Sequence, residues 1–476
     1  MADTDGPDML GPRQPAPCQP SSAPVAPAGR PAAPTASDGR PQGRFVLIAA
    51  GAVLTLLLLV VAGVAIFSGD PDSGQQAVAA ASAPAAAVTS ASLPATPADR
   101  AQLTLQQQSK ALIAGDEPGW LAAVDPSATA ARAFFQHRYR LLRVLHVSHY
   151  TAEFDSLPYT EPGTGTFTAQ VLSGYCFSLN SCPPIVGSDS SQQGAPKIRE
   201  TMTFRRVGDR YLISAIDSGE TGRLQPTPWQ AGDLSTAEGR RVTVAAAPGA
   251  RWRLRDAVVA GDRAATVVDR FAARFGNPQL RYRVYLADNT TWKQWFGTEP
   301  EPHVDGHAIP LNNVQTDVVI NTNAIKSDTD FAVTIQHELG HVASVGNRSR
   351  DGTFVLAVFD KWLVEGIAEY IAYYPHGAAA SPRRTGVRAL LHSPDSPRSV
   401  RGVVLGGSLR ADDQFYGYSH YTIDCLTHLY GQQRMITFVS QALRRHRSID
   451  EASRQAFGKP FDDIDQRCVT WIRQHA

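Results

Sequence analysis

Residues 331–345 read FAVTIQHELGHVASV, and this stretch decides how the C-terminal half of the chain is interpreted. Its apolar residues recur at helical spacing, which predicts a helix. His337 and His341 then lie one turn apart on one face, so that two imidazoles can reach a single metal ion. Glu338 is placed to take a proton from a water molecule at that ion. The stretch therefore predicts a metal centre; the alternative is an amphipathic helix with two hydrogen-bonded histidines.

A second helix is predicted for residues 361–374, which read KWLVEGIAEYIAYY. A catalytic zinc site keeps one position open for water, so a third protein ligand is needed from outside the first helix. We predict Glu365 for this role, because the chain after His341 is long enough for a second helix to pack back against the first. Glu369, one turn later, is predicted to accept the free N–H of a ligating histidine. The alternative is that both carboxylates face solvent, but apolar residues surround them.

The pattern HELGH followed by WLVEGIAEY resembles the gluzincin branch of the HExxH zinc metallopeptidases, including thermolysin-like and aminopeptidase-like members. The resemblance covers roughly residues 240–476. It implies one Zn²⁺ per chain, held by His337, His341 and Glu365, with Glu338 as the general base. It also implies a mainly helical zincin-like domain with a small sheet, and a protein or peptide substrate. The third histidine and methionine turn of the metzincins are missing.

The same families usually add a tyrosine or histidine that stabilises the oxyanion, on a helix beyond the third ligand. The corresponding region, 413–431, reads DQFYGYSHYTIDCLTHLYG. Tyr416 matches the aminopeptidase-like position best, and Tyr418, His420 and Tyr421 are rivals for the role. The Gly-Ala-Met-Glu-Asn motif of the aminopeptidases is absent, which favours endopeptidase or very restricted action, and the choice between endopeptidase and exopeptidase stays open.

The rest of the C-terminal region is predicted to contain a few strands and a long helix. His303 and His307 share the spacing of the HExxH histidines, but Pro302, Gly306 and Pro310 argue against a helix. We expect these two histidines in a loop or at a cleft edge. The strands are predicted at 242–246, 284–287 and 318–320, the long helix at about 251–275, and a short helix at 292–296.

Residues 98–228 are predicted to form a separate small α+β domain. A helical pattern comes first, and β-like runs follow, ending in a hairpin with its turn at Gly208 and Asp209. The segments GDEPGWLAAVDP and TFRRVGDRYLISAID resemble the cone-shaped nuclear-transport-factor-like, or cystatin-like, domains. Such domains are often binding or accessory modules, so the resemblance implies no chemistry here.

An uncharged apolar run at residues 45–67 predicts a transmembrane helix, since it is long enough to cross a hydrocarbon layer of roughly 30 Å. A cleaved signal peptide is the alternative. Arginines before the run and aspartates after it predict a single-pass protein of the cell membrane, with its N-terminus in the cytoplasm. Residues 1–44 are then a disordered cytoplasmic tail, residues 68–97 an Ala/Ser/Pro-rich linker, and the two domains extracytoplasmic.

Four cysteines fall in the predicted external part, where disulfide bonds persist. Proximity in sequence favours Cys176 with Cys182 and Cys425 with Cys468, although free buried thiols are the alternative. The net charge of +1 gives no reason to expect a nucleic-acid partner.

These observations predict an α+β fold class: a single N-terminal transmembrane helix, a small cone-like α+β domain and a mainly helical zincin-like domain. The predicted function is that of a membrane-anchored extracytoplasmic zinc metallopeptidase. The alternative is a surface binding or scaffold protein, in which the peptidase-like domain is degenerate and the 98–228 domain recognises a partner.

Overall fold

The computed structural model divides the chain into two compact units, residues 1–87 and 88–476, and all the described residues belong to the second. The described residues are 96–158, 165–187, 193–217, 227–230, 232–298, 300, 304–312, 314–345, 361–406 and 408–476.

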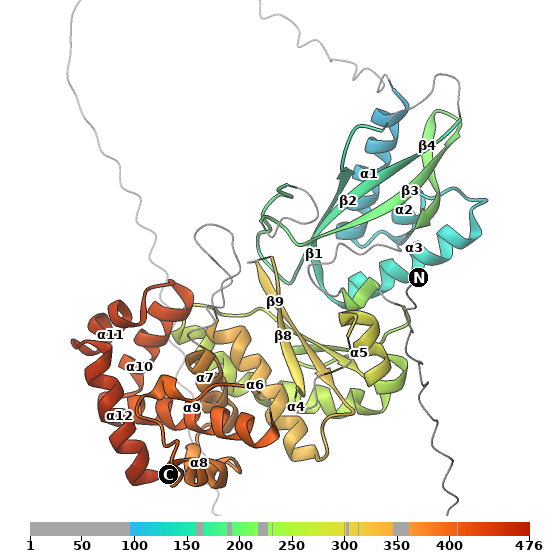
Figure 1. The fold of residues 1–476 in the computed structure, drawn as a ribbon. Helices are drawn as coiled ribbons and strands as arrows, with labels where there is room; N and C mark the ends of the chain where they lie inside the picture. Colours follow the sequence, from blue (N-terminus) through green and yellow to red (C-terminus); the bar gives the residue numbers. More distant parts are fainter. Residues whose placement is uncertain are drawn as a thin grey trace, which may run out of the picture. The chain divides into compact units, whose positions relative to one another are not determined.

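The first part of the second unit is an antiparallel sheet preceded by helices, as predicted (Figure 1). Its strands pair in chain order, β1-β2-β3-β4. The predicted turn at Gly208 and Asp209 is confirmed, and Gly208 adopts a left-handed φ of 62° there. The elements are α1 (Pro97–Ala114), α2 (Glu117–Leu121), α3 (Thr129–Val144), β1 (Val147–Phe154), β2 (Thr166–Phe177), β3 (Lys197–Val207) and β4 (Arg210–Asp217).

A second sheet of five strands has the order β5-β6-β7-β9-β8. The pairs β6–β7 and β7–β9 are parallel, whereas β5–β6 and β8–β9 are antiparallel. Three strands were predicted, and β5 and β8 were not. The elements are β5 (Ser235–Glu238), β6 (Val242–Ala246), the 3-10 helix η2 (Pro248–Arg253), α4 (Leu254–Arg274), β7 (Tyr282–Ala287), α5 (Asn289–Phe296), β8 (Gly306–Leu311) and β9 (Gln315–Asn321).

The two faces of this second sheet pack into different hydrophobic clusters, because successive side chains of a strand point to opposite faces. In β7, Val284 and Leu286 join the cluster formed with the helices of the C-terminal region. Tyr285 belongs instead to a cluster that also contains Tyr175 and Phe177 of β2. The described parts of the predicted 98–228 and 240–476 domains therefore share a hydrophobic core.

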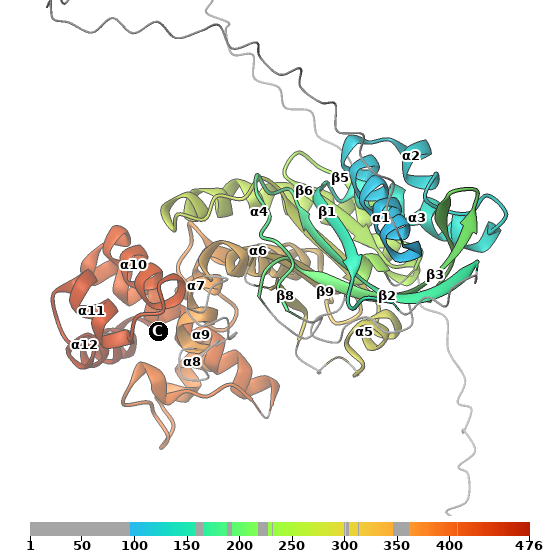
Figure 2. The same cartoon turned by 90° about the horizontal axis from the view of Figure 1, so that it is seen from above.

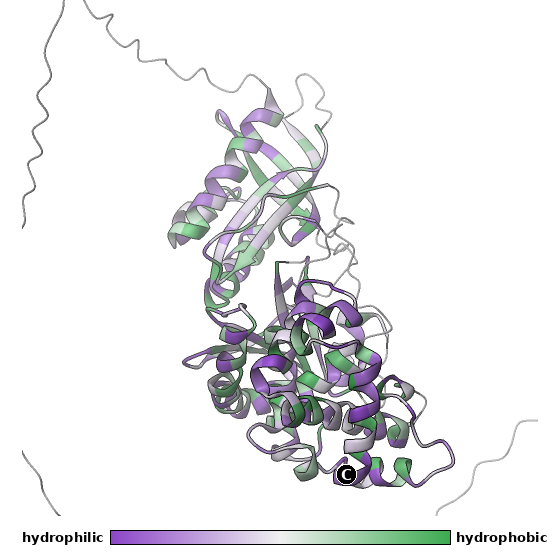
Figure 3. Cartoon of the chain, turned by 90° about the vertical axis from the view of Figure 1, so that its left-hand side faces the viewer, coloured by the Kyte–Doolittle hydropathy of each residue, from purple (hydrophilic) through white to green (hydrophobic). Residues whose placement is uncertain are grey.

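The helices after the sheet begin with α6 (Asp328–Ser344) and α7 (Lys361–Tyr373). Figures 1 and 2 show the later helices gathered at one side of the second sheet. Hydrophobic and hydrophilic residues alternate along them (Figure 3), as is typical of amphipathic helices. These later elements are α8 (Arg384–Leu391), α9 (Leu409–Tyr430), α10 (Gln432–Val439), the π-helix η6 (Ser440–Arg444), α11 (Ile449–Phe457) and α12 (Phe461–His475).

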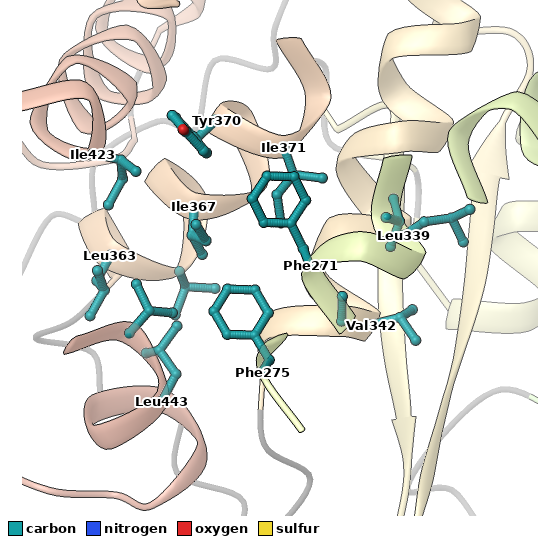
Figure 4. Close-up of a cluster of buried hydrophobic side chains, with 14 of the residues drawn as sticks. Phe271, Phe275, Leu339, Val342, Leu363, Ile367, Tyr370, Ile371, Ile423 and Leu443 are labelled. Carbon is teal, nitrogen blue, oxygen red and sulfur yellow. The ribbon is translucent and has the colours of Figure 1, made fainter. Parts of the chain in front are cut away.

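One apolar cluster joins α4, α6, α7 and α9 (Figure 4). Phe271 of α4, for example, packs edge-on against Tyr370 of α7, with ring centroids 6.0 Å apart. Both predicted disulfide bonds are confirmed: Cys176–Cys182 lies in the first part, and Cys425–Cys468 joins α9 to α12. The cluster fixes α6 and α7 side by side, and these two helices carry the predicted metal ligands.

The fold class predicted from the sequence requires a correction, because it included a single-pass transmembrane helix. Among the described residues, no helix combines the length and apolar character that crossing a membrane requires. The physical reason is charge: even the long helices α4 and α9 carry arginine and aspartate side chains. The predicted span, 45–67, lies outside the described residues, as do residues 1–44 and 68–95. The described fold is α+β with two sheets.

Candidate metal centre

Helix α6 carries the HELGH motif and packs closely against α7. The helix begins after Ser327, whose hydroxyl accepts a hydrogen bond from the backbone N–H of Asp330. Gly340, the glycine of the motif, permits the close approach of α7, because a Cβ atom there would lie only 3.3 Å from Cα of Ala368. The motif glycine therefore brings the histidines of α6 within reach of side chains on α7.

The two histidines of α6 converge as their spacing predicts. Nε2 of His337 and Nε2 of His341 are 3.1 Å apart. With Glu338, they form a buried group whose potential ligand atoms all lie within 4.8 Å of one another. This group could hold a metal ion.

Glu365, on α7, adds a carboxylate to the two imidazoles. Its Oε2 lies 3.2 Å from Nε2 of His337 and 3.2 Å from Nε2 of His341. The three atoms thus form a nearly equilateral triangle. Ligand atoms at about 2.0–2.1 Å from a tetrahedral zinc ion lie about 3.3–3.4 Å apart, so the spacing and the donor types fit such an ion. Glu338 belongs to the same buried group, but the contacts that close the triangle are those of Glu365.

A chain of polar contacts supports the outer side of His337. Its Nδ1 lies 3.1 Å from Oε1 of Glu369, which is only 2% exposed. The other carboxylate oxygen of Glu369 accepts a hydrogen bond of 3.3 Å from Nε of Arg383. Nη1 of Arg383 in turn donates to Asp413 at 2.9 Å. A proton on Nδ1 of His337, donated to Glu369, leaves the lone pair of Nε2 free to bind a metal ion.

The electrostatics of the site favour a positive charge at its centre. Burial lowers the pKa of His337, but hydrogen bonds to Glu365 and Glu369 outweigh burial and raise this pKa to about 10. Burial raises the pKa of Glu369, yet Arg383 and His337 outweigh it and lower this pKa to about 2. His341 and His337 likewise outweigh burial and lower the pKa of Glu365, so Glu365 and Glu369 are both ionised at neutral pH. In the metal-free chain they stabilise a proton on His337, and a bound cation would replace that proton.

Of the four candidates for the oxyanion-stabilising residue, Tyr416 is the one that lines the cavity at the histidines. Its ring centroid lies 6.0 Å from that of His337. Burial, followed by the nearby carboxylates, holds the pKa of Tyr416 well above its usual range, so its hydroxyl keeps its proton. Tyr418, His420 and Tyr421 are fully or almost fully buried in the same helix, with exposures of 0%, 0% and 1%.

The cavity at the histidines has a volume of about 380 Å³ and is bordered by α6, α7, α9 and the edge strand β8. Gly306 of β8 lies directly against the general-base candidate, since a Cβ atom there would be 3.0 Å from Oε1 of Glu338. Of the two alternatives expected for His307, a loop or a cleft edge, the structure has the second: His307 lies in the edge strand β8 and borders the cavity. Pro310 fits this strand because β8 is at the edge of the sheet. His303 lies outside the described residues.

Sequence reasoning missed Arg383, which also borders the cavity. No motif marks it, because it precedes a short helix and meets Glu369 only through the folding of the chain after α7. The strand β8 was missed as well, because GHAIPL shows no clear alternation of apolar and polar residues and contains a glycine and a proline.

In comparisons with known proteins, no protein-family model matches the chain, and no curated protein matches it significantly. The arrangement of the site itself is therefore the basis for a functional assignment.

Proposed function

We propose that the chain is a zinc metallopeptidase of the gluzincin type, with zinc held by His337, His341 and Glu365. The observation that carries the proposal is the triangle of Nε2, Nε2 and Oε2 atoms with edges of 3.1–3.2 Å. Two imidazoles and one carboxylate are a donor set of catalytic zinc, which leaves a fourth position for water or substrate. Structural zinc sites usually have four protein ligands, so a purely structural role is disfavoured.

The proposed reaction is hydrolysis of a peptide bond without a covalent enzyme intermediate. A zinc ion at the site would polarise the substrate carbonyl and lower the pKa of a water molecule to about 7. Glu338 accepts a proton from the attacking water and then passes it to the leaving amine. Tyr416, which stays protonated, donates a hydrogen bond to the carbonyl oxygen as negative charge develops there.

The edge strand β8 supports a peptide as the substrate. The backbone N–H of Asn321 donates to the carbonyl of Asp305 at 2.9 Å, which makes these two residues a hydrogen-bonded pair of the β8–β9 ladder. In an antiparallel ladder the pairs alternate, so the backbone groups of Gly306, Ala308 and Pro310 point to the open edge. An extended peptide can pair with these groups as an added strand. Such pairing would lay its backbone along the cavity.

An oxidising compartment is the proposed location of the catalytic domain. The two disulfide bonds support it, because such bonds are rare in proteins of the reducing cytosol.

A Glu338→Gln variant of the full-length chain tests the proposal. Amide replaces carboxylate without loss of volume, so zinc content should match that of the unaltered chain. Peptide hydrolysis, measured on a peptide library, should fall by a factor of about 10² to 10⁴. The matched control is Glu153→Gln, on the exposed side of β1, which should leave both quantities unchanged. Retained hydrolysis in Glu338→Gln would rule out the proposed base. A chain that binds no zinc would favour the alternative of a binding or scaffold protein.

A further inference from the structure

We propose that Arg383 is a positioning residue that holds the metal-supporting carboxylate Glu369 and the tyrosine Tyr416 in place together. The inference rests on the proposed function, because it assigns a role within the same site. Arg383 lies between α7, which carries Glu369, and α9, which carries Tyr416. A guanidinium group suits this task, since it is planar and offers five N–H donors in a fixed geometry.

The first branch of this arrangement leads to the metal centre. Nε of Arg383 donates to Oε2 of Glu369 at 3.3 Å, while Oε1 of Glu369 lies 3.1 Å from Nδ1 of His337. A carboxylate that is 2% exposed needs partners on both oxygens to keep one orientation. Arg383 is the partner of the outer oxygen of Glu369, so the direction of the His337 ring depends on it.

The second branch leads to the oxyanion side of the cavity. The guanidinium carbon of Arg383 lies 5.0 Å from the ring centroid of Tyr416, within the range of a cation–π contact. Its Nη1 also donates to Asp413, one turn before Tyr416 on α9. Gly417 allows this approach, because a Cβ atom there would lie 3.0 Å from Cβ of Arg383. One side chain thus fixes the ring of Tyr416 relative to the metal centre.

The backbone that carries Arg383 is itself tied down. The N–H of Ala378 donates to Oδ2 of Asp424 on α9 at 2.6 Å. The N–H of Arg383 donates to the hydroxyl of Ser381 at 3.3 Å. The segment before α8 therefore presents Arg383 from a fixed position.

The experiment compares Arg383→Met and Arg383→Lys in the purified full-length chain. Arg388→Met, an exposed arginine of α8, is the matched control. The first readout is zinc affinity, measured by competition with a chromogenic chelator, together with the visible absorption of the cobalt-substituted protein. We expect zinc binding about 10-fold weaker in both Arg383 variants, a changed cobalt spectrum, and no change in the control. Arg383→Lys keeps the positive charge but lacks the planar guanidinium group. Weaker zinc binding in this variant, if it is folded, is therefore due to the lost hydrogen-bond geometry and not to unfolding.

A double-variant cycle identifies the path of the effect. If Arg383 acts on the metal through Glu369, Arg383→Met should weaken zinc binding by less than about twofold once Glu369→Gln is present. Zinc binding that is unaltered in Arg383→Met, or a full additional loss in the double variant, would overturn the proposal. The readout of this experiment is zinc affinity, not peptide hydrolysis. A chain that binds zinc but cleaves no peptide would therefore contradict the proposed function, while the role of Arg383 would still be decided by the zinc affinities of its variants.

Discussion

Oε2 of Glu365 lies 3.2 Å from Nε2 of His341, although the two residues belong to different helices. Glycines make this contact possible, since Gly340 lets α6 and α7 approach, and Gly366 does the same for α7 and α9. The positions of the ligand atoms therefore depend on the close packing of α6, α7 and α9 as well as on the ligand residues themselves.

Replacing Glu365 by alanine should abolish tight zinc binding. The variant keeps both imidazoles but loses the only anionic donor of the triangle. We expect zinc affinity to fall by more than the roughly 10- to 100-fold typical of residues behind the ligands. Chelator competition measures the change, with Glu338→Gln as the comparison. Zinc binding as tight as in the unaltered chain would show that Glu365 is not a ligand.

The metal-free chain should lose stability as the pH rises from about 6.5 towards 10. The pKa of His337 is about 10 in the folded chain, compared with about 6.5 in an unfolded one. The folded state therefore binds this proton more tightly, and the stabilisation is complete below about pH 6.5 and disappears as the pH rises through 10. The other buried groups with shifted pKa values change their contribution to stability at lower pH. The folded-state pKa values of Glu369, His420 and Asp424 are about 2, 4 and 6.

Urea unfolding of the metal-free chain at about pH 6 and about pH 9 measures this effect, with His337→Gln as the control. The unaltered chain should lose more free energy of unfolding between the two pH values than the variant does. An equal loss in both proteins would mean that His337 is not responsible.

Gly366→Ala should destabilise the fold, whereas Gly386→Ala should not. A Cβ atom at position 366 would lie 2.6 Å from the carbonyl oxygen of Ser419, so α7 and α9 would have to separate, at a cost of about 1–3 kcal/mol. At position 386 the nearest atom would be at 3.7 Å, and removing a helical glycine should stabilise by up to about 1 kcal/mol. Thermal unfolding distinguishes the two variants, and stabilisation by Gly366→Ala would contradict the packing described.

The disulfide bond between Cys425 and Cys468 should contribute more stability than the one between Cys176 and Cys182. The first closes 43 residues of chain and the second closes 6, which corresponds to about 4 and about 2 kcal/mol in the loop-entropy account. Paired Cys→Ser variants and urea unfolding give the two values. The reverse order would show that local packing, and not loop length, determines the contribution.

Helices α6 and α7 could be predicted from the sequence because their apolar spacing and their charged residues are local signals. The choice of Tyr416 over Tyr418 rested only on its resemblance to the aminopeptidase-like position, because both residues lie on α9 and the packing of that helix decides which side chain meets the cavity. Arg383 could not be found, because its contact with Glu369 depends on how the chain turns between α7 and α8.

The strand β8 was not predicted because two of its six residues favour loops. Gly306 and Pro310 are typical of loops, but both are tolerated at a sheet edge, and whether a strand lies at an edge is decided by the whole sheet. The shared core of the two sheets was likewise not predictable, because it joins Phe177 and Tyr285, which are far apart in the sequence.

Zinc content of the purified full-length chain tests the central claim most directly. Elemental analysis should find one zinc ion per chain, lost in His337→Ala and kept in His376→Ala, an exposed histidine after α7. No zinc in the folded, zinc-supplied chain, or the same zinc content in His337→Ala, would contradict the proposed zinc site.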